Sequence, residues 1–81
     1  MEDNLKNLEV IKYETFKILE KCYSINMNSD KKSSSIEDCL DILNDINFLE
    51  KDIYVDNDFE NFNSEYLEIV NTYIDIKRFL N

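Results

Sequence analysis

Glycine, proline, histidine and tryptophan are all absent from this chain of 81 residues. Tight hairpins, phosphate-binding loops and Rossmann turns depend on glycine or proline for their backbone geometry, so these structures are disfavoured. A four-ligand Cys/His zinc site cannot be built, because Cys22 and Cys39 are the only cysteines and no histidine accompanies them. These absences argue against sheet folds, nucleotide-binding loops and structural zinc.

The lack of histidine also removes the usual general acid–base group and the neighbour that would activate a cysteine thiol. No concave site for a catalytic carboxylate can be inferred either. We therefore expect a protein that is not an enzyme and that carries no cofactor and no specific metal ion.

Long apolar runs are missing as well. No stretch approaches the roughly 18 uncharged apolar residues of a membrane span, and the opening segment MEDNLKNLEV is acidic rather than a basic leader. We expect a cytoplasmic protein with no membrane partner. In that compartment Cys22 and Cys39 are expected to be free core thiols, with a disulfide between them as the less favoured alternative.

What the chain does contain is apolar periodicity with helical spacing. The pattern predicts an all-α fold in one domain (1–81), a small three-helix bundle with helices at about 4–25, 35–50 and 58–80 in up-down-up order. The first predicted core stripe is Leu5, Leu8, Ile11, Thr15, Ile18, Leu19 and Cys22. The second is Ile36, Cys39, Leu40, Leu43, Ile46 and Leu49. The third is Phe59, Phe62, Tyr66, Ile69, Val70, Tyr73, Ile76 and Leu80, widened by Leu67 and Ile74.

The connections between these stripes are predicted from breaks in the periodicity. Residues 26–34, NMNSDKKSS, are predicted to form a loop, with Ser35 as the N-cap of the second helix. Residues 51–57, KDIYVDN, are predicted to form a connection that could hold a short extended segment. Asp56 or Asp58 can cap the third helix, which has an alternative start near Asn63 and Ser64.

Negative charge is concentrated in the middle of the chain. Between Glu37 and Glu68 there are eleven acidic residues and a single base, Lys51, whereas residues 1–36 hold six acids and six lysines. Concentrated charge builds a directional field, whereas evenly spread charge would only aid solubility. The alternative, that these carboxylates form no more than a solvated face, stays open at this point.

Alternating acids at Asp56, Asp58 and Glu60 resemble the first ligands of a calcium-binding EF-hand loop. That loop requires glycine at its sixth position and glutamate at its twelfth, where this chain has Asn61 and Leu67. The pattern therefore does not predict a calcium site.

The acidic segment favours a basic protein as the partner. Direct binding to nucleic acid is disfavoured, because affinity for phosphates comes mainly from Lys and Arg. The leading hypothesis is an acidic inhibitor that mimics nucleic acid and occupies the basic groove of a nucleic-acid-binding enzyme. The small size and biased composition suit a phage or mobile-element protein that disarms a host defence nuclease, as anti-CRISPR proteins do. The predicted partner-binding residues are Asp41, Asp45, Phe48, Asp52, Tyr54, Asp56, Asp58 and Glu60.

Two features qualify this hypothesis. Phe48 lies near the acidic side of the second predicted helix, so it is either an exposed anchor or a sign that the helix has already ended. The broad aromatic stripe of the third helix suggests a different function, a helical adaptor or a self-associating protein such as a homodimer. An antitoxin or immunity protein that covers a basic toxin is a third alternative.

Overall fold

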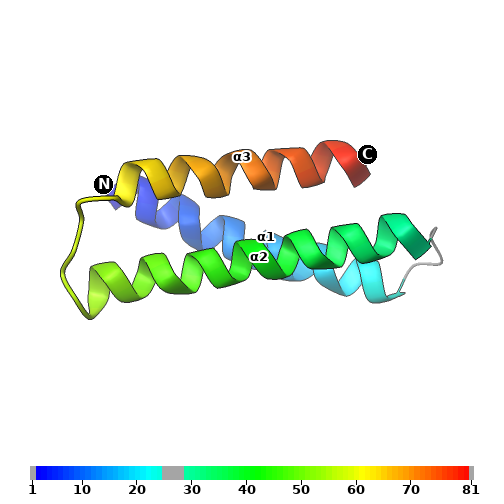
Figure 1. Ribbon diagram of the computed structural model, residues 1–81, viewed down its shortest axis with the longest axis horizontal. Helices are drawn as coiled ribbons and strands as arrows, with labels where there is room; N and C mark the ends of the chain where they lie inside the picture. Colours follow the sequence, from blue (N-terminus) through cyan, green and yellow to red (C-terminus); the bar gives the residue numbers. More distant parts are fainter. Residues whose placement is uncertain (1, 25–28, 81) are drawn as a thin grey trace.

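The computed structural model describes residues 2–24 and 29–80 and contains three α-helices: α1 (Glu2–Ser24), α2 (Ser29–Tyr54) and α3 (Phe62–Leu80). In Figure 1, α1 and α3 run in the same direction and α2 runs antiparallel to both. All three helices pack on one another in a rod of 42 × 20 × 17 Å. The structure confirms the predicted all-α three-helix bundle and its up-down-up order.

Core positions recur at alternating steps of three and four residues in every helix. This spacing is the heptad repeat of coiled coils, in which side chains of one helix insert between four residues of the next. The buried residues on α1 are Leu8, Ile11, Thr15 and Cys22. On α2 they are Ser35, Cys39, Ile42, Ile46, Leu49 and Ile53. On α3 they are Phe62, Ile69 and Ile76, with the half-buried Tyr66 and Tyr73 packed between them.

The second predicted stripe was partly wrong. Leu40, predicted to face the core, is 50% exposed, whereas Ile42, which the prediction omitted, is 1% exposed. Ile42 and Leu43 are adjacent apolar residues, and they belong to two overlapping helical stripes. The core of a three-helix bundle is narrow and accommodates only one of these stripes. The stripe that contains Ile42 and Ile53 is buried, and Leu43 lies half-buried at its edge.

The predicted start of the second helix was also wrong. α2 begins at Ser29, so residues 29–34 are helical rather than a loop, and Ser35 is a buried residue inside the helix rather than its N-cap. Residues 25–28 of the predicted loop and helix end lie outside the described residues. The extra turns let α2 run antiparallel along the full length of α1, and this packing overrides the weak helix propensity of the serines.

The connection between α2 and α3 lies further along the chain than predicted, at residues 55–61 rather than 51–57. Residues 51–54 are helical because Ile53 adds one more buried side chain to the core. The chain then turns at Asn57, whose φ of 53° lies in the left-handed region; asparagine tolerates this region and so serves where glycine is absent. The Lys51 carbonyl accepts hydrogen bonds from the backbone N–H groups of Val55 and Asp56, which end the helix.

α3 begins at Phe62 and not at residue 58. This start is closer to the predicted alternative near Asn63 and Ser64. Asp58 does not cap the helix, because its Oδ1 accepts a hydrogen bond from the Glu60 N–H at 3.1 Å inside the connection. The first turn of α3 is instead tied to Asn61, whose carbonyl accepts hydrogen bonds from the Ser64 hydroxyl and the Glu65 N–H.

Candidate functional site

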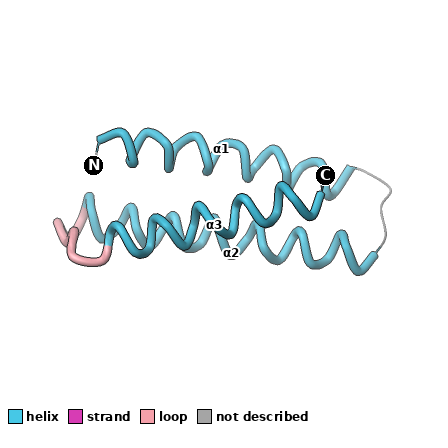
Figure 2. Tube along the Cα trace, turned by 90° about the horizontal axis from the view of Figure 1, so that it is seen from above, coloured by secondary structure: helices cyan, strands magenta, loops and turns pink. Residues whose placement is uncertain are grey.

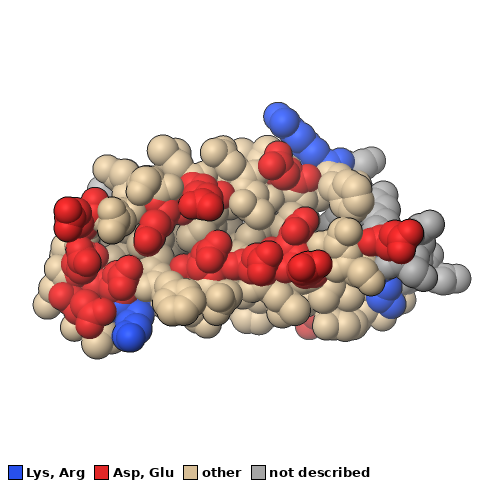
Figure 3. Space-filling model, viewed as in Figure 1, with Lys and Arg blue, Asp and Glu red and all other residues tan. Residues whose placement is uncertain are grey.

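The main candidate site is a groove between α2 and α3 that carboxylates line from both sides. We call Asp45 and Asp52 of α2, with Glu65 and Glu68 of α3, the acidic seam. These residues, together with Phe48 and the floor residue Ile69, line a hollow of about 320 Å³. In Figure 3 the acidic side chains follow α2 and α3 and continue around the connection between them.

The seam forms because each of its members flanks a core position. Asp45 and Asp52 each directly precede a buried isoleucine of the α2 heptad, and Glu65 directly precedes Tyr66 on α3. Flanking positions of this kind in coiled coils usually carry opposite charges on neighbouring helices. Here both helices contribute carboxylates, so the residues that border the α2–α3 contact repel one another.

The pKa values of two seam carboxyls reflect partial burial first and this repulsion second. Partial burial, followed by the charges of Glu68 and Asp41, raises the pKa of Asp45 above its usual value of 3.8. Partial burial also raises the pKa of Glu65 above its usual 4.5, with further contributions from several carboxylates, Asp52 first among them. Among the described residues, no cation contributes to either shift, so this part of the chain leaves the negative charge of the seam uncompensated.

The contact between α1 and α2 is built differently. Lys12 of α1 donates a hydrogen bond to Glu50 of α2 in a salt bridge of 3.1 Å. The α1–α2 contact therefore has a favourable ion pair, whereas the α2–α3 contact is bordered by like charges. Among the described residues, the seam therefore adds no ion pair to the α2–α3 contact.

The structure gathers only some of the predicted partner-binding residues at the groove. Asp45, Phe48 and Asp52 line it, and Phe48 is 61% exposed on a helix that continues to Tyr54, so it has the geometry of an exposed anchor. Asp41 lies one helical turn before Asp45 on α2. Tyr54, at the end of α2, is exposed and is not among the residues that line the groove.

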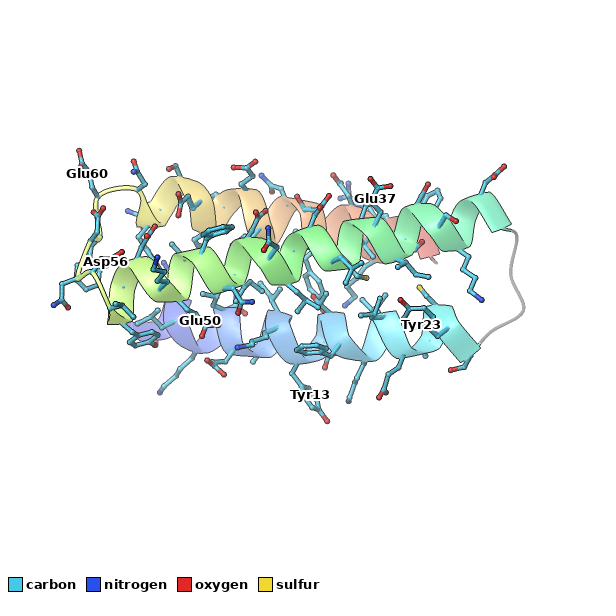
Figure 4. The ribbon with its side chains drawn as sticks, turned by 60° about the horizontal axis from the view of Figure 1, so that its bottom comes forward. Tyr13, Tyr23, Glu37, Glu50, Asp56 and Glu60 are labelled. Atoms are coloured by element: carbon cyan, nitrogen blue, oxygen red, sulfur yellow. The ribbon has the colours of Figure 1, made fainter. Side chains whose placement is uncertain are left out.

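The remaining predicted residues lie in the connection at one end of the bundle. Asp56, Asp58 and Glu60 are all exposed there, and Figure 4 shows Asp56 and Glu60 at that end. Asp58 is close enough to contribute to the raised pKa of Glu65. These three acids therefore extend the charge of the seam around the end of the rod without lining the groove.

The sequence prediction missed Glu65 and Glu68. Both are part of the acidic segment, but nothing near them in the sequence indicates that they face Asp45 and Asp52. Only the topology could have indicated this proximity. When the second and third helices pack antiparallel, the start of the third lies beside the end of the second.

Within the described residues, no group of three or more Cys, Asp or Glu side chains is arranged to hold a metal ion. No helix of that part of the chain is long and apolar enough to cross a membrane. No family model, curated protein or solved structure matches this chain.

The aromatic stripe of α3 is mostly turned inward. Phe62 is buried and stacks on Tyr66 with ring centroids 5.8 Å apart, and the half-buried Tyr73 packs against the core. The apolar side chains that stay exposed on this helix include Leu67 and Ile74. An adaptor interface on α3 would have to use these aliphatic residues together with Phe79, which is 50% exposed near the end of the helix, rather than Phe62, Tyr66 or Tyr73.

Proposed function

We propose that this protein is a non-enzymatic inhibitor whose acidic seam occupies a basic nucleic-acid-binding groove on another protein. The observation that carries the proposal is the like-charged α2–α3 contact, at positions where a bundle built only for stability would place ion pairs. Proteins commonly retain such electrostatic strain at sites of function.

The geometry of the seam suits this function. Carboxylates held on two helices keep their spacing when a partner approaches, so little conformational entropy is lost on binding. A concentrated negative field also accelerates association with a basic surface. Phe48, exposed among the carboxylates, supplies an apolar anchor of the kind that often dominates binding energy.

The proposed partner is a nuclease or another nucleic-acid-handling enzyme, such as a host defence nuclease if the chain is encoded by a phage or mobile element. Bound to that groove, the seam would exclude the nucleic acid by occupying the same cationic residues. The chain itself would not bind nucleic acid, because its seam and the phosphates repel each other.

A matched pair of triple variants tests the proposal. Asp45→Asn, Asp52→Asn and Glu65→Gln together neutralise the seam, and Asp3→Asn, Glu14→Gln and Glu20→Gln remove the same charge from α1. Each tagged protein is used to capture partners from the lysate of its native host, followed by elution with DNA or RNA.

The wild type and the α1 variant are expected to capture the same basic protein, which nucleic acid displaces. The seam variant is expected to bind at least tenfold more weakly while melting at an equal or higher temperature, because like-charge repulsion has been removed. Binding should also weaken steeply as salt is raised from 50 to 300 mM. Equal capture by the seam variant would rule out the acidic-seam mechanism.

A further inference from the structure

The outer face of α1 is the second unusual surface of the molecule. Val10, Tyr13 and Phe16 are 55%, 61% and 50% exposed there, although none of them is needed to close the core. Figure 4 shows Tyr13 pointing away from the other two helices. Because the acidic seam lies between α2 and α3, this apolar face is on the opposite side of the bundle.

The charges around this face are antisymmetric about Tyr13. Counted outward from Tyr13, Val10 matches Phe16 at three residues, Glu9 matches Lys17 at four, and Lys6 matches Glu20 at seven. Each of these four charged residues therefore has a residue of opposite sign at the same distance on the other side, whereas Lys21, eight residues from Tyr13, is matched by Leu5 and is not part of the pattern. None of the four makes an ion pair with another described residue. A helix with this pattern is complementary to an antiparallel copy of itself.

The shape of the face agrees with its charges. A shallow hollow of about 220 Å³ is lined by Glu9, Lys12, Tyr13 and Phe16. Residues spaced at zero, three, four and seven are the four that form a hole for a side chain of a facing helix. When an antiparallel copy is centred on Tyr13, the side chain that reaches this hollow is the Tyr13 of that copy.

We propose that the occupant of this face is a second copy of the chain, docked through an antiparallel pair of α1 helices about a two-fold axis at Tyr13. Glu9 then faces Lys17 of the second copy, and Lys6 faces its Glu20. Lys17 already lies over the Tyr13 ring, with its Nζ 4.6 Å from the centroid, which places its charge near the centre of the contact.

The distribution of net charge favours this face over the acidic α2–α3 side. Each chain carries a net charge of −9, which opposes association. In the α1-to-α1 arrangement the two seams point outward in opposite directions, and the surfaces that meet are close to neutral. A contact made by a single helix face of each copy is small, below about 1,200 Å² in total, which is the size of weak and transient contacts, so the dimer is expected only at high protein concentration.

Single and paired charge reversals test the geometry of the contact. In sedimentation velocity from about 10 µM to 1 mM, the wild type is expected to shift from monomer to dimer. Glu9→Lys alone and Lys17→Glu alone should each remain monomeric to at least tenfold higher concentration, because each places like charges across the two-fold axis. An equimolar mixture of the two variants should dimerise again, because each then supplies the charges that the other lacks.

The mixing result separates the contact from effects within one helix, because residues 9 and 17 are too far apart to pair on the same helix. Tyr13→Glu should also abolish the dimer, whereas Val55→Glu, at an equally exposed position beyond the end of α2, should not. Circular dichroism at 222 nm checks that every variant is folded. A wild type that stays monomeric at 1 mM, or a mixture that does not recover, would overturn the proposal.

The proposed dimer does not depend on the proposed inhibitor function. The α1 contact leaves the acidic seam uncovered, so a monomeric wild type could still bind a basic partner. Conversely, a seam variant that binds nothing is expected to dimerise like the wild type.

Discussion

Two hydroxyl groups in the core have no hydrogen-bond partner among the described residues. Thr15 Oγ1 and Ser35 Oγ are both buried, and each residue is 1% exposed. Burying an unsatisfied hydroxyl costs about 1–3 kcal/mol, so these two residues weaken a small core.

The same core also contains the small side chains of Cys22 and Cys39. Burial is the first cause that raises the pKa of Cys39, to about 11, so its thiol is inert at neutral pH.

Thr15→Val should stabilise the protein, because it keeps the shape of the side chain and replaces the unpaired hydroxyl with a methyl group. The free energy of unfolding is expected to rise by about 1 kcal/mol, and the Tm by about 4–8 °C. Thr72→Val is the control, because the Thr72 hydroxyl donates to the Glu68 carbonyl and its loss should bring no gain. Thermal melts of both variants measure these changes in Tm. A Tm of Thr15→Val equal to or below that of the wild type would show that the Thr15 hydroxyl is hydrogen-bonded.

The seam carboxyls predict an inverted pH dependence of stability. The pKa values of Asp45 and Glu65 in the folded chain lie above their usual 3.8 and 4.5, so the folded state holds these protons more tightly than the unfolded state. Their contribution to stability is therefore present at low pH and is lost as pH rises through the raised pKa values. Urea unfolding should show that these two carboxyls contribute more to the free energy of unfolding at pH 4 than at pH 7.

Asp45→Asn combined with Glu65→Gln should flatten this pH dependence and raise the stability at pH 7. Removing like-charge contacts is worth about 0.2–0.5 kcal/mol for each pair, or about 1–4 °C in Tm. The matched control is Asp75→Asn, because Asp75 is followed on α3 by Lys77 and Arg78 rather than by further acids. A pH profile of the double variant that matches the wild type would contradict the assignment.

At the scale of the elements, α2 is the helix on which the other two depend. It borders α1 through the Lys12–Glu50 pair and α3 through the acidic seam, and it is the longest of the three helices at 26 residues. Figure 2 shows the three helices running alongside one another, with the connection between α2 and α3 at one end. An additional tie at the start of α1 is the hydrogen bond from the Asn7 amide to the Tyr66 hydroxyl. Changes in α2 are therefore expected to affect the whole bundle.

The early start of α2 can be tested with substitutions at Ser34, an exposed helical residue. Ser34→Pro should cost about 3 kcal/mol, because proline removes a helical hydrogen bond and clashes with the preceding turn. Ser34→Ala should stabilise by up to about 0.5 kcal/mol through its higher helix propensity. Both values come from urea unfolding followed by circular dichroism. If residues 29–34 formed a loop, both substitutions would be close to neutral.

At the scale of the whole molecule, the rod has two chemically different sides. The α2–α3 side carries the seam and most of the negative charge, and the outer face of α1 is balanced and aromatic. In a three-helix bundle the groove between two helices faces away from the third helix. The acidic seam and the outer face of α1 therefore lie on opposite sides. A dimer through α1 would therefore present two seams in opposite directions, and it could bind two copies of a basic partner.

The sequence by itself determined the fold class and the location of the charge. The heptad-like spacing of apolar residues along the chain is a local property that does not depend on which helices meet. The residues Leu8, Ile11, Cys22, Ile46, Leu49, Phe62 and Ile69 were identified from that spacing and are buried. The absence of glycine and proline pointed the same way. The acidic segment from Glu37 to Glu68 is likewise a count along the chain.

Only the tertiary structure decided which of two overlapping stripes on α2 faces inward, and how far that helix extends. Both depend on the length and position of α1, which no local pattern near Ile42 or Ser35 encodes. The acidic seam also depends on tertiary packing. Asp45 and Glu65 are twenty residues apart in sequence, and they come close only when α3 packs antiparallel against α2. Local periodicity fixed the helices, and the long-range pairing of those helices made the site.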